Sequence, residues 1–188
     1  MSAGRVILAL DTSAGYGGAA RAAAALARAL GRELAGLFLE DENLVRLAGF
    51  PFARQVPVSG GPARPVEREV VESQLRALAA AARQDLARAA STLQVRWSFE
   101  VRRGALPAAA LAAAGEADLL LLGARLAALA QGPLQGRLVE PPERRPSVPR
   151  LALAVLVEED SPILAGEAAQ RLIAELGLPV LHVRRRPP

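Results

Sequence analysis

The stretch Asp118-Leu119-Leu120-Leu121-Leu122-Gly123 decides the fold that we expect for this chain. Its apolar run is too short for a helix and does not alternate with polar residues, which is typical of a strand buried on both faces of a parallel sheet. In open α/β sheets, ligands bind beyond the carboxyl ends of the strands, where the strand order reverses. Gly123 and the residues after it are therefore the first place to look for a functional site.

The beginning of the chain predicts a βαβ unit. An apolar strand covers Arg5 to Leu10, a helix covers about Ala19 to Leu30 and ends at Gly31, and a second strand covers Leu34 to Leu39. Crossovers of this kind are right-handed, so the two strands should be parallel.

The segment Glu40 to Pro65 is longer than an ordinary connection, and we interpret it as a functional lid or a mobile arm. After it, Val66 to Leu93 repeat apolar residues at helical spacing. Val95 to Arg102 then alternate apolar and polar residues, which is the pattern of a half-exposed edge strand. A short helix, Ala108 to Ala114, leads to the central strand.

The segment Leu126 to Pro149 is rich in glycine and proline, so no long helix can cross it. Beyond it the chain predicts a strand over Leu151 to Val157, a helix over Ile163 to Leu176 and a strand over Val180 to Val183. This layout is similar to that of the first βαβ unit.

We expect a single α/β domain over residues 1–188. It divides into a core of residues 1–137, a proline-rich connector of residues 138–150 and a βαβ unit of residues 151–188. That last unit either completes the sheet or is a truncated second repeat. The expected architecture has three layers, with a mostly parallel open sheet and helices on both faces.

The composition excludes several kinds of site. The chain has no cysteine, which excludes disulfides, zinc–thiolate sites, iron–sulfur clusters and cysteine nucleophiles. No apolar run approaches the roughly 20 residues needed to span a bilayer, and no signal-peptide layout opens the sequence. We therefore expect a cytoplasmic protein that does not bind membranes.

The basic residues do not predict a nucleic-acid site. All 23 of them are arginine, and most are scattered among acidic residues at helical spacing. The basic cluster Arg184 to Arg186 lies at the end of the sequence, and we interpret it as a solvated chain end rather than a phosphate-binding tail.

The order of the predicted elements resembles the universal stress protein family, within the adenine-nucleotide alpha-hydrolase-like α/β folds. The resemblance covers residues 5–136. Family members that bind ATP carry an aspartate after the first strand, and Asp11 stands at that place. They also carry Gly-x-x-Gly-x9-Gly-(Ser/Thr) after the fourth strand, where Gly123 and Gly136 match. Leu126 replaces the middle glycine and Arg137 replaces the hydroxyl residue.

These two replacements degrade the ATP-binding loop. Glycine lets the backbone approach phosphate oxygens, and Leu126 should block that approach. Arg137 could supply charge to a phosphate instead. Both a weakened and a lost nucleotide site are therefore open, since Asp11 could also be a helix cap and the glycines could be simple turn residues. The resemblance implies a nucleotide site made of Asp11, Thr12, Ser13, Leu39, Gly123, Arg125, Gly136 and Arg137.

The resemblance implies a regulatory protein that binds ATP or another adenine nucleotide, with Mg²⁺, and not an enzyme. The sequence offers no nucleophile–base pair, no catalytic residue and no metal site of its own, and His182 is the only histidine. The alternative is an interaction module of the same fold that binds no nucleotide. In that case the partner surface would be the loop of Phe50 and Phe52 together with the terminal strand Val180 to Val183, through which a homodimer is expected.

Overall fold

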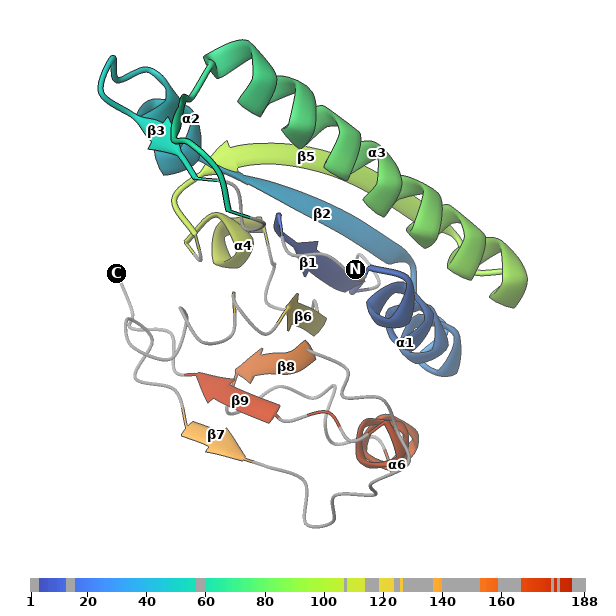
Figure 1. The fold of residues 1–188 in the computed structure, drawn as a ribbon. Coiled ribbons are helices and arrows are strands. Elements are labelled where there is room, and N and C mark those ends of the chain that lie inside the picture. Colours follow the sequence, from blue (N-terminus) through green and yellow to red (C-terminus); the bar gives the residue numbers. More distant parts are fainter. Residues whose placement is uncertain are drawn as a thin grey trace.

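The computed structural model describes residues 4–12, 16–56, 60–106, 108–113, 119–123, 126, 137–139, 153–158, 167–176, 178 and 180–183. Within these residues, seven strands form one sheet in the order β5-β2-β1-β6-β8-β9-β7 (Figure 1). They are β1 (Val6–Leu10), β2 (Leu34–Asp41), β5 (Trp97–Gly104), β6 (Leu119–Gly123), β7 (Arg137–Val139), β8 (Leu153–Glu158) and β9 (Val180–Val183).

The sheet is mostly parallel, as the sequence predicts. β5, β2, β1 and β6 all run in the same direction. β8 is antiparallel to β6, β9 is parallel to β8, and β7 is antiparallel to β9. The C-terminal strands therefore join the same sheet as the first four, with the direction of the chain reversed at β8.

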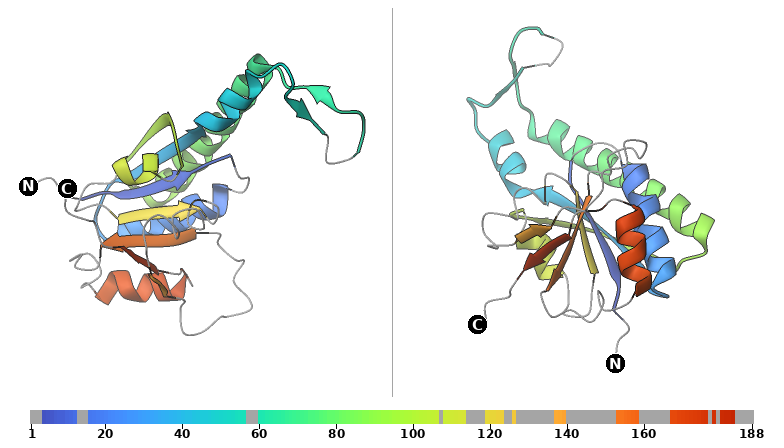
Figure 2. Two further views of the ribbon diagram at one scale, coloured as in Figure 1. Left: turned by 90° about the vertical axis from the view of Figure 1, so that its left-hand side faces the viewer. Right: turned by 90° about the horizontal axis from the view of Figure 1, so that it is seen from below.

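Helices pack on both faces of this sheet, which confirms the expected three-layer α/β fold (Figure 2). One face carries α1 (Tyr16–Ala29), α3 (Arg68–Leu93) and α6 (Glu167–Glu175). The other face carries α4 (Ala108–Ala113) together with Leu126. None of the described helices is long and apolar enough to cross a membrane.

β1 shows why the sheet is buried on both sides. Val6, Leu8 and Leu10 belong to the core under α1 and α3, whereas Ile7 and Ala9 belong to the core on the α4 side. Since side chains of a strand alternate between faces, an apolar strand with no polar residue must be covered twice.

A glycine allows α3 to pack closely on β2. A Cβ atom at Gly36 would lie 2.5 Å from Leu86 Cδ2 and 2.8 Å from Phe99 Cδ2, closer than carbon atoms can pack. Leu86 of α3 and Phe99 of β5 therefore meet above Gly36 in the space that a side chain would fill.

The segment that we interpret as a lid or mobile arm contains secondary structure of its own. It forms α2 (Glu42–Ala48) and a small antiparallel hairpin of β3 (Arg54–Gln55) and β4 (Arg64–Pro65). β2 continues to Asp41, whose Oδ1 accepts a hydrogen bond of 3.0 Å from the backbone N–H of Asn43 and so caps α2. We call residues 42–65 the arm; in both views of Figure 2 its hairpin of β3 and β4 projects away from the sheet.

One prediction about the edges of the sheet is confirmed and one is wrong. β5 is an edge strand, as its alternating pattern predicts. β9 is not, because it pairs with β8 on one side and with β7 on the other. Its backbone is engaged in both ladders, so the second edge among the described strands is β7.

Replacing Gly36 with alanine should destabilise the protein by about 1–3 kcal/mol, because the added methyl group forces Leu86 and Phe99 apart. The measurement is urea unfolding followed by circular dichroism. Gly17→Ala is the matched control: a Cβ atom there would meet its nearest neighbour, Asp85 Oδ2, at 3.6 Å, and alanine favours the helix. Equal stability of Gly36→Ala and the wild type would contradict this packing.

Candidate functional site at the carboxyl edge of the sheet

The strand order reverses between β1 and β6. From β1 the chain passes to β2 and then β5 on one side, and later returns to place β6 on the other side of β1. Ala9 of β1 is level with Leu122 of β6, so Asp11 and Gly123 follow at the same edge of neighbouring strands. This arrangement brings together two of the three residues that match the family motif, at the position where open α/β sheets bind ligands.

Asp11 is almost completely buried, with 2% of its surface exposed. Its backbone is held by Tyr16, the first residue of α1, whose hydroxyl donates a hydrogen bond of 2.9 Å to the carbonyl oxygen of Asp11. The ring of Tyr16 lies edge-on to Phe38 of β2, with a centroid distance of 6.3 Å. Tyr16 therefore connects the end of β1 to both α1 and β2, a role that the sequence analysis misses.

The pKa of the Tyr16 phenol is raised by its surroundings at this edge. Burial raises the pKa of the Tyr16 phenol above its ordinary value of 10.0, and the carboxylate of Asp11 raises this pKa further. The phenol is therefore neutral at physiological pH and serves as a hydrogen-bond donor beside a carboxylate.

Leu39 also lies near this edge, but its side chain is fully buried in the core on the α4 side. β2 continues two residues past it, to Asp41. Only the backbone of Leu39 can therefore contact a ligand, as the family resemblance implies for an adenine ring. Thr12 follows Asp11 directly at the same edge.

Leu126, which takes the place of the middle glycine of the motif, is a core residue. Its side chain is fully buried in the core formed with Ile7, Leu37 and Leu122. Three residues after the end of β6 the chain thus already contributes to the core. Replacing Leu126 with glycine would therefore leave a hole in the core.

Arg137 lies far from Asp11 and Gly123. It is the first residue of β7, which is separated from β6 by β8 and β9, or about 14 Å at a strand spacing of about 4.8 Å. In the register of the sheet, Arg137 of β7 lies opposite His182 of β9, and His182 lies opposite Val157 of β8. β8 is antiparallel to β6 and Leu156 lies opposite Leu120, so Val157 is level with the amino end of β6. The backbone of Arg137 therefore lies at the other end of the sheet from Asp11 and Gly123. The remaining predicted site residues, Ser13, Arg125 and Gly136, lie outside the described residues.

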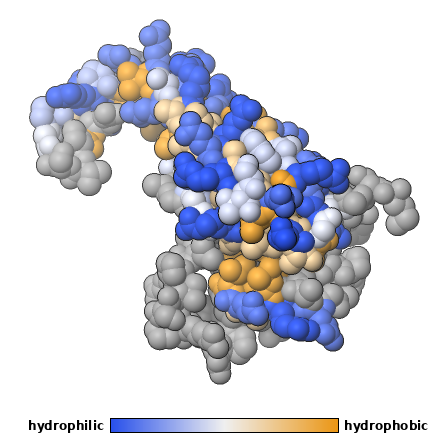
Figure 3. All heavy atoms as spheres, turned by 90° about the vertical axis from the view of Figure 1, so that its right-hand side faces the viewer, coloured by the Kyte–Doolittle hydropathy of each residue, from blue (hydrophilic) through white to orange (hydrophobic). Residues whose placement is uncertain are grey.

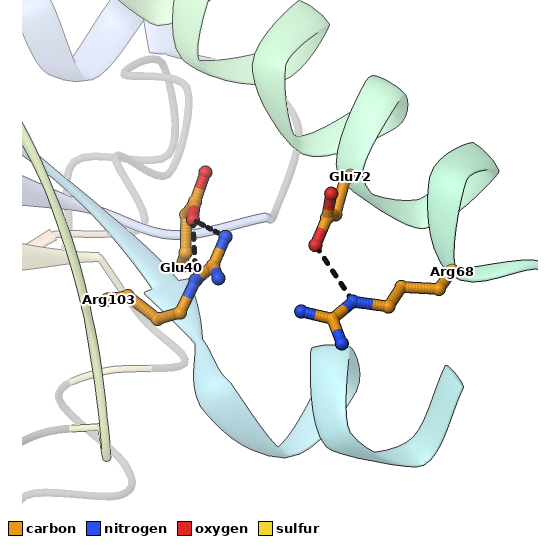
Figure 4. A network of polar contacts seen from close by, with 4 residues as sticks. All are labelled: Glu40, Arg68, Glu72 and Arg103. Atoms are coloured by element: carbon orange, nitrogen blue, oxygen red, sulfur yellow. Dashed lines mark hydrogen bonds and ion pairs between the residues drawn. The ribbon is translucent and has the colours of Figure 1, made fainter. Parts of the chain in front are cut away.

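A polar cluster that the sequence analysis misses lies beside the candidate site, at the ends of β2 and β5 (Figure 4). Nε and Nη2 of Arg103 donate hydrogen bonds of 3.0 Å and 2.8 Å to one carboxylate oxygen of Glu40, which is 9% exposed. In the same cluster, Nε of Arg68 donates a 3.0 Å hydrogen bond to Oε1 of Glu72.

The charges of this cluster favour the ionised form of Glu72. The hydrogen bond from Arg68 lowers the pKa of Glu72, burial opposes that shift, and the nearby positive charges of Arg68, Arg103 and Arg76 lower it further. Each of the two carboxylates thus has an arginine partner. We interpret the cluster as a structural connection between the sheet, α3 and the base of the arm rather than as an anion site.

Two further observations concern metal and ligand binding in the described part of the chain. In the described part of the chain, no group of three or more His, Cys, Asp or Glu side chains could hold a metal ion. A cavity of about 200 Å³ over β1, β2 and β5 is lined by residues such as Ala35, Ser98 and Arg102, and does not include Asp11 or Gly123. A divalent cation at Asp11 would therefore need most of its ligands from phosphate oxygens and water.

No protein-family model matches the sequence, and a search of curated proteins finds no similar one. The function must therefore be argued from the geometry of the site.

Leu126→Ala should destabilise the protein by about 2–5 kcal/mol, because it removes a fully buried side chain and leaves a cavity. Leu126→Met, which keeps the volume, should cost less than about 1.5 kcal/mol. Denaturant unfolding of both variants measures the difference. If Leu126→Ala were as stable as the wild type, residue 126 would not belong to the core.

Tyr16 is the only tyrosine, so the ultraviolet absorbance of tyrosinate reports this residue alone. We expect it to titrate above 10.0, because burial and the Asp11 carboxylate both raise its pKa. Asp11→Asn removes the second cause, so the pKa should fall but stay raised by burial. The raised pKa stabilises the fold below pH 10.0, and this contribution is lost as the pH rises through the folded-state value.

The matched control for this titration is Glu167→Gln, which removes an exposed carboxylate on α6 and should leave the pKa of Tyr16 unchanged. Circular dichroism over the same pH range verifies that the protein stays folded. A wild-type pKa at or below 10.0, or an identical pKa in Asp11→Asn, would contradict the described environment.

Proposed function

We propose that this chain is a cytoplasmic regulatory protein resembling universal stress proteins, and that it binds an adenine nucleotide weakly at the carboxyl ends of β1 and β6. One observation supports this proposal above the others: Asp11 and Gly123 lie on neighbouring strands at the point where the strand order reverses. Both residues are also among those that the family resemblance marks.

Each residue of the site has a distinct role in this proposal. The Asp11 carboxylate accepts a hydrogen bond from the nucleotide or contributes one oxygen ligand to its Mg²⁺. Gly123 has no side chain, so a phosphate can approach the backbone at the end of β6. The backbone near Leu39 contacts the adenine ring. Bound Mg²⁺ would neutralise phosphate charge and reduce the repulsion between the nucleotide and Asp11.

Weak affinity follows from what the site lacks relative to the motif. Leu126 belongs to the core and Arg137 lies near the opposite end of the sheet, so neither contributes a phosphate contact. Loss of such contacts removes charge-assisted hydrogen bonds, which are the strongest kind available to a phosphate. The nucleotide would then act by population shift, stabilising one arrangement of the segment after β6.

We propose binding without turnover. The phenol beside Asp11, that of Tyr16, has a raised pKa, which makes it a poor base at neutral pH. Any hydrolysis of ATP would be slow and incidental to binding.

The second candidate function is an interaction module that binds no nucleotide. The observation that favours it is the exposure of Phe50 and Phe52 on the arm, 45% and 73% respectively. A homodimer remains part of both proposals, but β9 is paired on both sides, so dimer formation by strand pairing would use β5 or β7.

Calorimetric titration with Mg-ATP tests the first proposal against the second. We expect a dissociation constant of about 0.1 mM, which corresponds to about −5.5 kcal/mol. Asp11→Asn should weaken binding about tenfold, because it removes a charged contact. Glu167→Gln is the control and should bind as the wild type does.

The protein should first be checked for nucleotide carried through purification. If protein free of nucleotide gives no heat at millimolar Mg-ATP, the nucleotide proposal is wrong and the interaction module stands. Binding that is unchanged in Asp11→Asn would place the nucleotide at another site.

A further inference from the structure

Hydrophobic side chains are concentrated on the outside of the arm. Among the described residues, six large hydrophobic side chains are exposed, and four of them are Leu47, Phe50, Phe52 and Val56. The remaining two, Val70 and Val101, lie apart on α3 and β5. Exposed apolar groups that occur singly are ordinary, whereas a cluster on one projecting segment marks a binding surface.

The two phenylalanines form the centre of this cluster. Their rings stack with a centroid distance of 5.2 Å and an interplanar angle of 15°. Phe52 is 73% exposed despite this contact. The stack orders the two rings without burying them in the protein. Binding of the rings to a partner surface therefore costs little additional conformational entropy.

The arm carries positive charge only, apart from its first residue. Residues 43–65 include Arg46, Arg54 and Arg64 and no aspartate or glutamate. Arg46 lies 3.9 Å from Glu42 at the start of α2. Arg54 and Arg64 lie on the paired strands of the hairpin and are exposed. The occupant of this surface must therefore offer negative charge next to an apolar phase.

The arm is accessible from outside the body of the protein. In Figure 2 it extends beyond the end of α3, away from the sheet. In Figure 3, which views another face, a few hydrophobic residues lie among hydrophilic ones on the projecting part. A projecting segment of this shape can contact a flat surface without a clash from the rest of the fold.

We infer that the arm docks on an anionic lipid surface, with Leu47, Phe50, Phe52 and Val56 in the boundary between headgroups and acyl chains and with Arg54 and Arg64 at the lipid phosphates. Aromatic and aliphatic side chains partition into this boundary, and arginines beside them gain from the negative surface potential. The same surface satisfies both the apolar and the cationic part of the arm. This contact is peripheral, and it departs from the expectation that the chain does not bind membranes.

Single-stranded nucleic acid fits the arm less well. It binds through open ring faces along a basic groove, whereas each phenylalanine here has one face covered by the other. Leu47 and Val56 have aliphatic side chains that offer no stacking surface to a base.

Co-sedimentation of the purified full chain with vesicles tests the inference. Vesicles of phosphatidylcholine containing phosphatidylglycerol should bind the protein, with binding that weakens as salt rises. Vesicles of phosphatidylcholine alone should bind it much less. Phe52→Ser should lower the partition coefficient about tenfold. The pair Arg54→Gln and Arg64→Gln should lower it about 25-fold, or about fivefold for each arginine.

Val101→Ser and Arg88→Gln are the matched controls. They remove an exposed hydrophobic residue of β5 and an exposed arginine of α3, and should leave binding unchanged. As a direct probe, Phe52→Trp in a Trp97→Phe background should show blue-shifted emission on vesicles. Urea unfolding of every variant verifies that the fold is intact.

Three outcomes would overturn the inference. The first is no binding to the anionic vesicles, or equal binding to both kinds. The second is binding that the arm substitutions leave unchanged. The third is an arm that binds another partner while the wild type binds no vesicles. If Phe52→Ser dissociates a dimer in sedimentation velocity, the occupant of the arm is a second copy of the chain. If Phe52→Ser abolishes binding of a single-stranded oligonucleotide, the occupant is a nucleic acid. None of these outcomes bears on the nucleotide site.

Discussion

The burial of β1 between β2 and β6 is the constraint on which the rest of this structure depends. Each of its five residues is at most 4% exposed, and both of its edges are paired. A strand held on two faces and two edges cannot shift without breaking several of these interactions at once. Its carboxyl end therefore presents Asp11 at a fixed position, and the hydrogen bond from Tyr16 adds a connection to α1. The candidate site is preorganised because its supporting strand is enclosed on both faces and paired at both edges.

The sequence predicts the elements of this fold better than it predicts their pairing. The apolar runs of β1 and β6, the helical spacing of α3 and the alternation of β5 are local patterns, and each of these elements is present. The reversal of direction at β8 and the place of β7 outside β9 depend on how the chain returns through the segment after β6. Periodicity within a short strand such as Val180–Val183 does not distinguish an edge from an interior position, because both contain the same residue types.

The difference between local patterns and strand pairing also explains which residues of the candidate site could be predicted. Asp11 and Gly123 could be found from the sequence because the end of an apolar strand is readable, and their adjacency follows from one pairing, β1 with β6. Leu126 and Arg137 were matched to a motif by linear spacing alone, and spacing does not tell which way the chain turns after Gly123. Glu40 and Arg103 are 63 positions apart, so their ion pair follows from the register of β2 and β5 and has no local signal.

The long helix α3 connects the closely packed core at Gly36 to the arm. The helix has 26 residues, and the arm is attached at its first turn, whereas Leu86 meets Gly36 in its second half. The buried residues of the helix run from Leu75 to Ala90, so the helix is held along most of its length. Only the part before Leu75, about 10 Å at a rise of about 1.5 Å per residue, extends beyond this core and connects it to the arm that carries Phe50 and Phe52.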